Sequence, residues 1–172
     1  KHERECKMKK RWLLALLFTC LLFVPRLVFA VDFDILSYKG DLNIHADNTA
    51  VFKETITYHF KDDFNGQLIG LGKAGKMPKG FEIDDKPTVL VSKNGQIVQD
   101  VLSYTKEEED GYKVTIFNPG NAGDTVRVTV TWQLKNLLFL YLDIAELNWH
   151  PLTDSSGAIN DLEFRVTSDS PA

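Results

Sequence analysis

Cysteine is absent from most of this chain. The two cysteines, Cys6 and Cys20, both lie within the first 30 of the 172 residues. A domain built from the remaining residues, 31–172, therefore contains no disulfide and must be stabilised by a hydrophobic core. Its length, about 140 residues, is that of one ordinary globular domain and suffices for such a core.

Basic residues are also scarce once the first 30 residues are set aside. That segment holds seven of the 20 Lys and Arg residues but only two of the 24 Asp and Glu residues, so residues 31–172 carry 13 basic and 22 acidic side chains, a net charge of −9. Nucleic acids and anionic lipid surfaces both attract basic faces. The composition therefore argues against a nucleic-acid partner and against electrostatic adhesion to an anionic membrane.

No hydrophobic run is long enough to cross a bilayer. The longest, Leu13–Val24, has 12 residues, whereas a transmembrane helix needs about 20. Basic residues 9–11 precede this run, and Val28 and Ala30 put small or medium side chains at positions −3 and −1 of a cleavage point. This is the pattern of a secretory signal peptide, and it predicts a helical leader over residues 8–30.

Two other interpretations of the leader are weaker. A retained transmembrane anchor would need a longer apolar run, and a lipoprotein signal would not place its cysteine, Cys20, in the middle of that run. Residues 1–7, which precede the first methionine, are interpreted as upstream sequence. The chain is thus expected to divide into a leader, residues 1–30, and one exported domain, residues 31–172, with cleavage before Val31.

Alternation of apolar and polar residues recurs through the expected domain. In the clearest case, Thr125–Leu134, every second residue is Val, Trp or Leu and the residues between are polar. This predicts a strand with one face on the core, and it places Trp132 in that core. Residues 49–60 and 162–166 show the same period, turn dipeptides such as Asn94-Gly95 separate such segments, and no long helical pattern occurs. The sequence therefore predicts an all-β fold, an antiparallel β-sandwich of about seven to nine strands.

Weaker segments leave more than one interpretation open. Short strands are expected over residues 33–37 and 41–46, with a tight turn at Gly40 between them. Residues 137–146 are the one segment where a helical turn competes with other structure. Residues 61–87 carry five glycines and two prolines, which predicts a long loop that serves as a variable binding surface. The candidate binding residues in this loop are Asn65, Gly66, Gly70, Gly72, Lys73, Gly75 and Lys76.

No cofactor or metal site is expected. Residues 70–75 match the glycine pattern of a dinucleotide-binding turn, but such a turn must open a helix, and Pro78 follows too closely to allow one. The histidines His45, His59 and His150 are far apart and have no cysteine partners, so their spacing is not that of a zinc site.

Two carboxylates are candidates for structural polar sites. Glu54 falls on the apolar face of the strand expected over residues 49–60, where a charge must be paired by a cation or by several hydrogen-bond donors. The cations considered for this pairing are Lys135, Arg127 and Arg165. Glu146 lies between an apolar run and Trp149, where backbone amides of an irregular turn would satisfy it. Both glutamates are expected to be structural rather than catalytic.

Several short segments of the sequence are similar to segments of a known protein family. They are Phe52–Phe60, Phe64–Gly66, Asp143–Trp149 and Asn160–Phe164. In this order they resemble the YciQ-like family of bacterial predicted membrane proteins, a domain of unknown function. The resemblance covers essentially Val31–Ala172 and implies an extracytoplasmic β domain that precedes transmembrane helices and a cytoplasmic tail. It implies no reaction.

The chain departs from that family in two places. Residues 70–76 are richer in Gly and Lys than the more hydrophobic, arginine-containing family segment, and no membrane helix follows Ala172. The resemblance then implies that the chain is the extracytoplasmic portion alone. Contact with a membrane would run through the leader before cleavage or through downstream helices, and a chain that truly ended at Ala172 would be secreted.

The function expected from the sequence is non-enzymatic. We expect an extracytoplasmic domain of a membrane-associated protein that serves recognition, sensing or assembly at the cell envelope, with an envelope protein or a glycan as partner. The alternative is a cell-envelope glycan hydrolase or carbohydrate-binding module that uses Glu54, Glu146, Trp132 or Trp149. Two carboxylates facing each other in an open cleft would favour the hydrolase, whereas a filled sandwich would favour binding.

Overall fold

Every element of regular secondary structure in the part of the chain that the structure describes is a β-strand. This part of the computed structural model comprises residues 31–72, 77–109, 111–152 and 157–169. Val31–Ala172 forms one compact unit, and all buried core residues of the described part belong to it. A unit with its own core is a domain that can fold alone. The leader expected over residues 1–30 lies outside the described residues.

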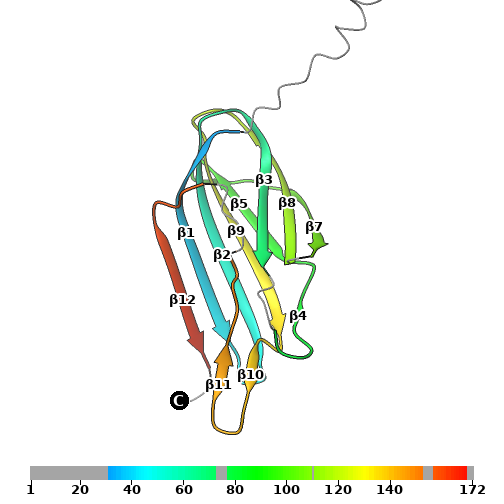
Figure 1. The fold of residues 1–172 in the computed structure, drawn as a ribbon. Coiled ribbons are helices and arrows are strands. Elements are labelled where there is room, and N and C mark those ends of the chain that lie inside the picture. Colours follow the sequence, from blue (N-terminus) through cyan, green and yellow to red (C-terminus); the bar gives the residue numbers. More distant parts are fainter. Residues whose placement is uncertain (1–30, 73–76, 110, 153–156, 170–172) are drawn as a thin grey trace, which may run out of the picture. The chain divides into compact units, whose positions relative to one another are not determined.

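Seven strands form the large sheet. Their order is β12-β1-β2-β9-β5-β6, and β4 pairs with β9 as well (Figure 1). The pairing is antiparallel except between β1 and β12, which run parallel. The seven strands are β1 (Phe33–Ile44), β2 (Thr49–Phe60), β4 (Glu82–Ile83), β5 (Thr88–Lys93), β6 (Gln96–Ile97), β9 (Thr125–Lys135) and β12 (Leu162–Ser168).

The remaining strands form two smaller units. The small sheet has the order β3-β8-β7, and β10 and β11 pair with each other in a separate hairpin. Their bounds are β3 (Phe64–Gly72), β7 (Leu102–Glu108), β8 (Gly111–Gly120), β10 (Leu138–Leu140) and β11 (Ala145–Leu147). The predicted all-β class is confirmed. Twelve strands are described rather than seven to nine, because β4, β6, β10 and β11 have only two or three residues, too few to show alternation.

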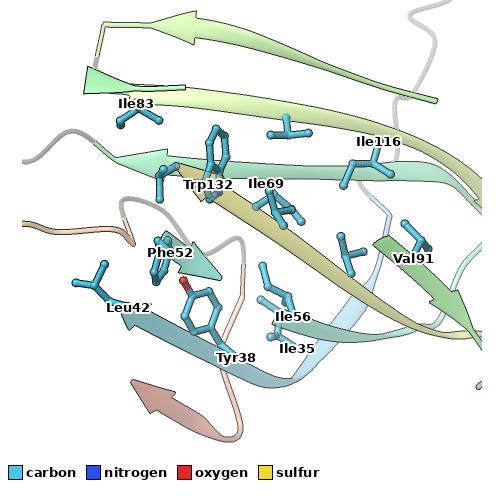
Figure 2. Close-up of a cluster of buried hydrophobic side chains, with 14 of the residues drawn as sticks. Ile35, Tyr38, Leu42, Phe52, Ile56, Ile69, Ile83, Val91, Ile116 and Trp132 are labelled. Carbon is cyan, nitrogen blue, oxygen red and sulfur yellow. The ribbon is translucent and has the colours of Figure 1, made fainter. Parts of the chain in front are cut away.

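The core lies between the inner faces of the large and the small sheet. Figure 2 shows Trp132 of the large sheet near Ile69 of the small sheet, and both are buried in one cluster with Ile116, also of the small sheet. The ring of Trp132 lies 6.2 Å from that of Tyr112, measured between centroids. Every second residue of β9 from Val126 on is buried, as the alternation predicted. Burial of this apolar area is the main stabilising contribution to the fold.

The prediction of a tight turn at Gly40 is wrong. Residues 33–44 form the single strand β1, and Gly40 lies inside it. A Cβ atom at this position would stand 2.6 Å from Cδ2 of Phe164, on the neighbouring strand β12, and 3.2 Å from the ring of Phe52. Glycine is therefore present here because an aromatic ring packs against the strand, and not because the chain turns.

Gly40→Ala is expected to lower the free energy of unfolding by about 1–3 kcal/mol, the cost of an added methyl group that displaces the ring of Phe164 packed on this strand. The measurement is a urea titration monitored by tryptophan fluorescence. Gly157→Ala is the matched control, because nothing lies within 4 Å of a Cβ atom there. A Gly40→Ala protein as stable as the parent would contradict the packing of Phe164.

Residues 137–146 form no helical turn. They contain β10 and the start of β11, and Asn48 attaches this hairpin to the turn between β1 and β2. The Leu138 N–H donates to Oδ1 of Asn48 at 2.8 Å, and Nδ2 of Asn48 donates to the Leu138 carbonyl at 3.1 Å. A hydrogen bond from the Asn136 N–H to the Asn48 carbonyl, 2.9 Å, adds a third link. Among the described residues, no helix could span a membrane.

Candidate functional site

Glu54 lies in the core of the sandwich with both carboxyl oxygens hydrogen-bonded. It is on β2 and only 1% exposed. Nε1–H of Trp132 donates to Oε1 at 2.9 Å, and the hydroxyl of Tyr38 donates to Oε2 at 3.1 Å. These donors come from β9 and β1, the two strands that flank β2. The three side chains form a buried polar cluster, which we call the Glu54 cluster.

Both donors of the Glu54 cluster are neutral, and this sets its electrostatics. Burial removes water from the carboxyl group and raises the pKa of Glu54 from its ordinary 4.5 to about 7. The hydrogen bonds from Trp132 and Tyr38 act in the opposite direction and lower this pKa, but their effect is smaller. Burial and the nearby carboxylate likewise raise the pKa values of Tyr38 and Tyr58. Near neutral pH the cluster therefore exchanges one proton while remaining inside the core.

The cations considered for Glu54 do not pair with it. Arg127 is exposed. Lys135 lies at the end of β9, where its Nζ is 3.4 Å from Glu82, and Arg165 lies 3.1 Å from Glu163 on β12. The expectation that Glu54 is buried and satisfied by several donors agrees with the structure, but a cation is not among its partners.

Glu146 is not placed as expected. It is on β11, where it pairs in register with Phe139, and it is exposed. No irregular turn of backbone amides surrounds it. Glu54 is in the core between the sheets, so the structure does not bring the two glutamates together. The pair of facing carboxylates that would have favoured a hydrolase is not formed by these residues.

Neither candidate tryptophan is a platform for sugars. Trp132 is fully buried, and Trp149 is 8% exposed. Nε1–H of Trp149 donates to the Gly72 carbonyl at 2.9 Å, and its ring packs edge-on against Phe52 with centroids 5.0 Å apart. Both indoles are structural, because a sugar platform requires an exposed ring face.

The prediction of a loop over residues 61–87 is wrong for residues 64–72 and for the two-residue strand β4 at residues 82–83. Residues 64–72 form β3, so Asn65, Gly66, Gly70 and Gly72 belong to a strand. Gly66 is required by close approach, since a Cβ atom there would stand 1.9 Å from the Ile116 carbonyl oxygen. Lys73, Gly75 and Lys76 lie outside the described residues. The local sequence does not distinguish this glycine-rich strand from a loop, because the contact with Ile116 on another strand is not local.

Two of these glycines lie on the outer face of the small sheet, which carries an apolar patch. The register places side by side Gly66, Phe117 and Leu102 in one row and Leu68, Thr115 and Tyr104 in the next. Four large side chains of this face are each at least 51% exposed. They are Leu68, Leu102, Tyr104 and Phe117, and we call them the small-sheet patch. The rings of Tyr104 and Phe117 lie 6.0 Å apart.

An acidic groove lies beside the C-terminal end of β9, where Gln133 and Lys135 are among its lining residues. Its volume is about 380 Å³. Four carboxylates, Tyr112 and Lys135 are among the residues that line it. The carboxylates are Glu82, Asp84, Asp85 and Glu107. Among the described residues no group of His, Cys, Asp and Glu is arranged to hold a metal ion. Sequence reasoning missed this groove, since its residues come from four separate segments.

Comparison with known proteins gives a family. Residues 34–171 match the model of the family described as "Predicted membrane protein (DUF2207) N-terminal domain". No curated protein matches the chain. Similar solved structures include an M1 zinc metallopeptidase from Deinococcus radiodurans, 17% identical over 60% of this chain and 20% of that chain, with a TM-score of 0.34. Native leukotriene A4 hydrolase from Saccharomyces cerevisiae is 13% identical over 59% and 15%, with a TM-score of 0.37. Likeness at this level carries no argument about function.

Proposed function

The chain belongs to the family of predicted membrane proteins that share this N-terminal domain, and we propose that the domain acts outside the cytoplasm as a non-enzymatic module that recognises a protein partner. The apolar run of residues 13–24, the basic residues before it and the small residues before Val31 support export. We also propose that the chain is a YciQ-like protein, which the sequence segments 52–60 and 143–149 support.

The observation that carries the proposal is the small-sheet patch. Single exposed apolar residues are ordinary on a protein surface, but a contiguous apolar group that includes two aromatic rings marks an interaction site. Here four such side chains lie in two adjacent rows of one sheet face. Aromatic and aliphatic residues at the centre of a polar surface are the composition of protein interfaces.

A protein surface fits this patch better than a glycan does. Two of its four members are leucines, Leu68 and Leu102, which offer no flat ring for a sugar to stack on. In the described part of the chain, β8 is the sole neighbour of β7, so the other edge of β7 offers backbone groups to a partner strand. The proposed occupant is therefore an apolar protein segment that covers the patch and pairs with β7.

The small-sheet patch can be tested in the bacterial envelope by placing the photocrosslinker benzoylphenylalanine at Thr115, which lies between Leu68 and Tyr104. We expect an adduct with one protein, and we expect Phe117→Ser to reduce its yield about tenfold, the loss of one buried aromatic anchor. Leu90→Ser is the matched control, because Leu90 is 60% exposed on a different sheet.

Two outcomes would contradict the proposal. One is an adduct that persists unchanged in the Phe117→Ser protein, or that falls equally with Leu90→Ser. The other is an adduct that consists of glycan and disappears on digestion with a muramidase. The second outcome would favour a carbohydrate-binding module.

A hydrolase is the second candidate, and the acidic groove is the observation that favours it. Several carboxylates line one cavity, and acid–base hydrolysis of a glycan requires at least two carboxyl groups at one site. Incubation of residues 31–172 with purified cell-wall glycan distinguishes the candidates. The binding module releases no reducing ends, whereas a hydrolase releases them and loses this activity in Asp85→Asn or Glu107→Gln.

A further inference from the structure

The tip of the β10–β11 hairpin exposes the most apolar short segment of the described chain. Leu140, Tyr141 and Ile144 are each more than half exposed, and Leu142 is fully exposed. Asp143 is the one charged residue among residues 140–144. Tip residues of a hairpin in water are ordinarily polar turn formers, so a run of this composition requires an apolar contact.

The hairpin is attached firmly to the domain. Asn48 holds Leu138 through both its N–H and its carbonyl, at 2.8 and 3.1 Å. At the tip, the Tyr141 N–H donates to the Ile144 carbonyl at 2.9 Å. Because this turn satisfies backbone groups internally, the tip can leave water at a smaller cost than an open loop can.

The same end of the domain is the one at which its last strand finishes. The Asp169 N–H, directly after β12, donates to the carbonyl of Ile44 at 2.9 Å. Ile44 ends β1, and Asn48 in the following turn holds the hairpin. The end of β12 and the hairpin thus lie at one end of the large sheet (Figure 1).

The family supplies the partner chemistry at this end. Its members are described as predicted membrane proteins in which this is the N-terminal domain, so the membrane part of such a protein follows the end of β12. We propose that the hairpin tip inserts into the interfacial region of a lipid bilayer and holds this end of the domain against the membrane. This role is separate from the protein recognition proposed for the small-sheet patch.

The size of the tip suits a bilayer better than a protein. A stable protein interface needs about 800 Å² on each partner, whereas four side chains at the end of a two-stranded hairpin form a narrow point. A three-residue strand such as β10 is about 10 Å long, similar to the depth of 5–10 Å that interfacial anchors reach. Tyrosine, with an apolar ring and a polar hydroxyl, is typical of that depth.

Charge at this end determines which lipids should bind. Asp143 and Glu146 lie on the hairpin, and Asp47 lies in the turn beside Asn48. These carboxylates repel an anionic surface. Binding should therefore be apolar in origin, insensitive to salt and stronger on zwitterionic phosphatidylcholine than on vesicles that contain phosphatidylglycerol.

Co-sedimentation of residues 31–172 with phosphatidylcholine vesicles tests the proposal. We expect half of the protein to bind at about 1 mM lipid, which is about tenfold weaker than the binding of a single myristoyl chain. Leu142→Ser should weaken binding about tenfold, the loss of one buried leucine. Asp143→Asn should strengthen it several-fold by removing a charge from the inserting tip. Circular dichroism of each variant and its sedimentation without lipid separate this gain from unfolding and aggregation, both of which expose apolar core surface.

Ile97→Ser is the matched control. Ile97 is 72% exposed on the β5–β6 hairpin, whose Lys93 pairs with Val126 at the opposite end of β9 from Lys135. Because residues 31–172 contain no cysteine, a single cysteine at 142 or at 97 can carry an environment-sensitive nitrobenzoxadiazole label. Lipids should shift the emission to the blue at 142 and leave it unchanged at 97.

The proposal is overturned if the parent does not sediment at several millimolar lipid, if Ile97→Ser weakens binding as much as Leu142→Ser, or if the label at 142 does not respond. It is also overturned if light scattering shows a dimer that Leu142→Ser dissociates, since the tip would then contact a second copy of the chain.

Discussion

Trp132→Ala is expected to lower the free energy of unfolding by about 3–5 kcal/mol, the range for deleting a large aromatic side chain from a filled core. Trp132 is fully buried between the two sheets, so the deletion leaves a cavity that the surrounding side chains fill only in part. It also removes the donor to Oε1 of Glu54, 2.9 Å away, and leaves a buried acceptor without a partner. The measurement is urea unfolding followed by circular dichroism.

Exposed positions of the same strand provide the controls. Arg127→Ala and Gln133→Ala are expected to change stability by no more than about 0.5 kcal/mol, because both side chains face solvent. Thr129 is not such a control, since its hydroxyl lies 3.1 Å from that of Thr55. Equal losses at Trp132, Arg127 and Gln133 would contradict the burial pattern of β9.

Stability is expected to fall as the pH rises from about 4.5 to about 7. The folded state raises the pKa of Glu54 to about 7, so between these values the folded protein holds a proton that the unfolded chain has released. A group of this kind stabilises fully below its unfolded pKa, and the contribution is lost as the pH rises through the folded pKa. A shift of this size corresponds to about 3 kcal/mol.

Glu54→Gln isolates this effect from other titrating groups. Glutamine can still accept from Trp132 and can donate to the Tyr38 oxygen, but it carries no proton to lose. We expect the variant to unfold at a similar or slightly lower urea concentration than the parent at pH 5, and to be the more stable of the two at pH 8. Parallel stability curves of parent and variant between pH 5 and 8 would contradict the raised pKa.

The neutrality of the donors decides the sign of the Glu54→Gln effect. If a cation paired with Glu54, then Glu54→Gln would be destabilising at every pH above the ordinary pKa of the carboxyl group, since it would leave that cation unpaired. Because the donors are Trp132 and Tyr38, both uncharged, the ionised form has no compensating charge. Near pH 8, Glu54→Gln is therefore expected to raise the free energy of unfolding, and not to lower it.

The local pattern of the sequence determined the class of fold and the inward-facing residues. The alternation in Thr125–Leu134 placed Trp132 in the core, and that of residues 49–60 placed Glu54 there. Side-chain direction along a strand has a period of two, so neighbours in sequence suffice to establish it. The parallel pairing of β12 with β1 and the shortest strands were not visible, because they depend on segments far apart or on too few residues.

The tertiary structure alone decided what each of these residues meets. Tyr38 is 16 residues and Trp132 is 78 residues from Glu54, so strand order, and not local pattern, selects the donors of the Glu54 cluster. Gly40 and Gly66 indicated turns or loops by composition, yet both lie in strands where a ring or a carbonyl of another strand leaves no room for a Cβ atom. Such close approaches arise only when distant strands pack, and for this reason the sequence determined the faces of the strands while the fold determined their partners.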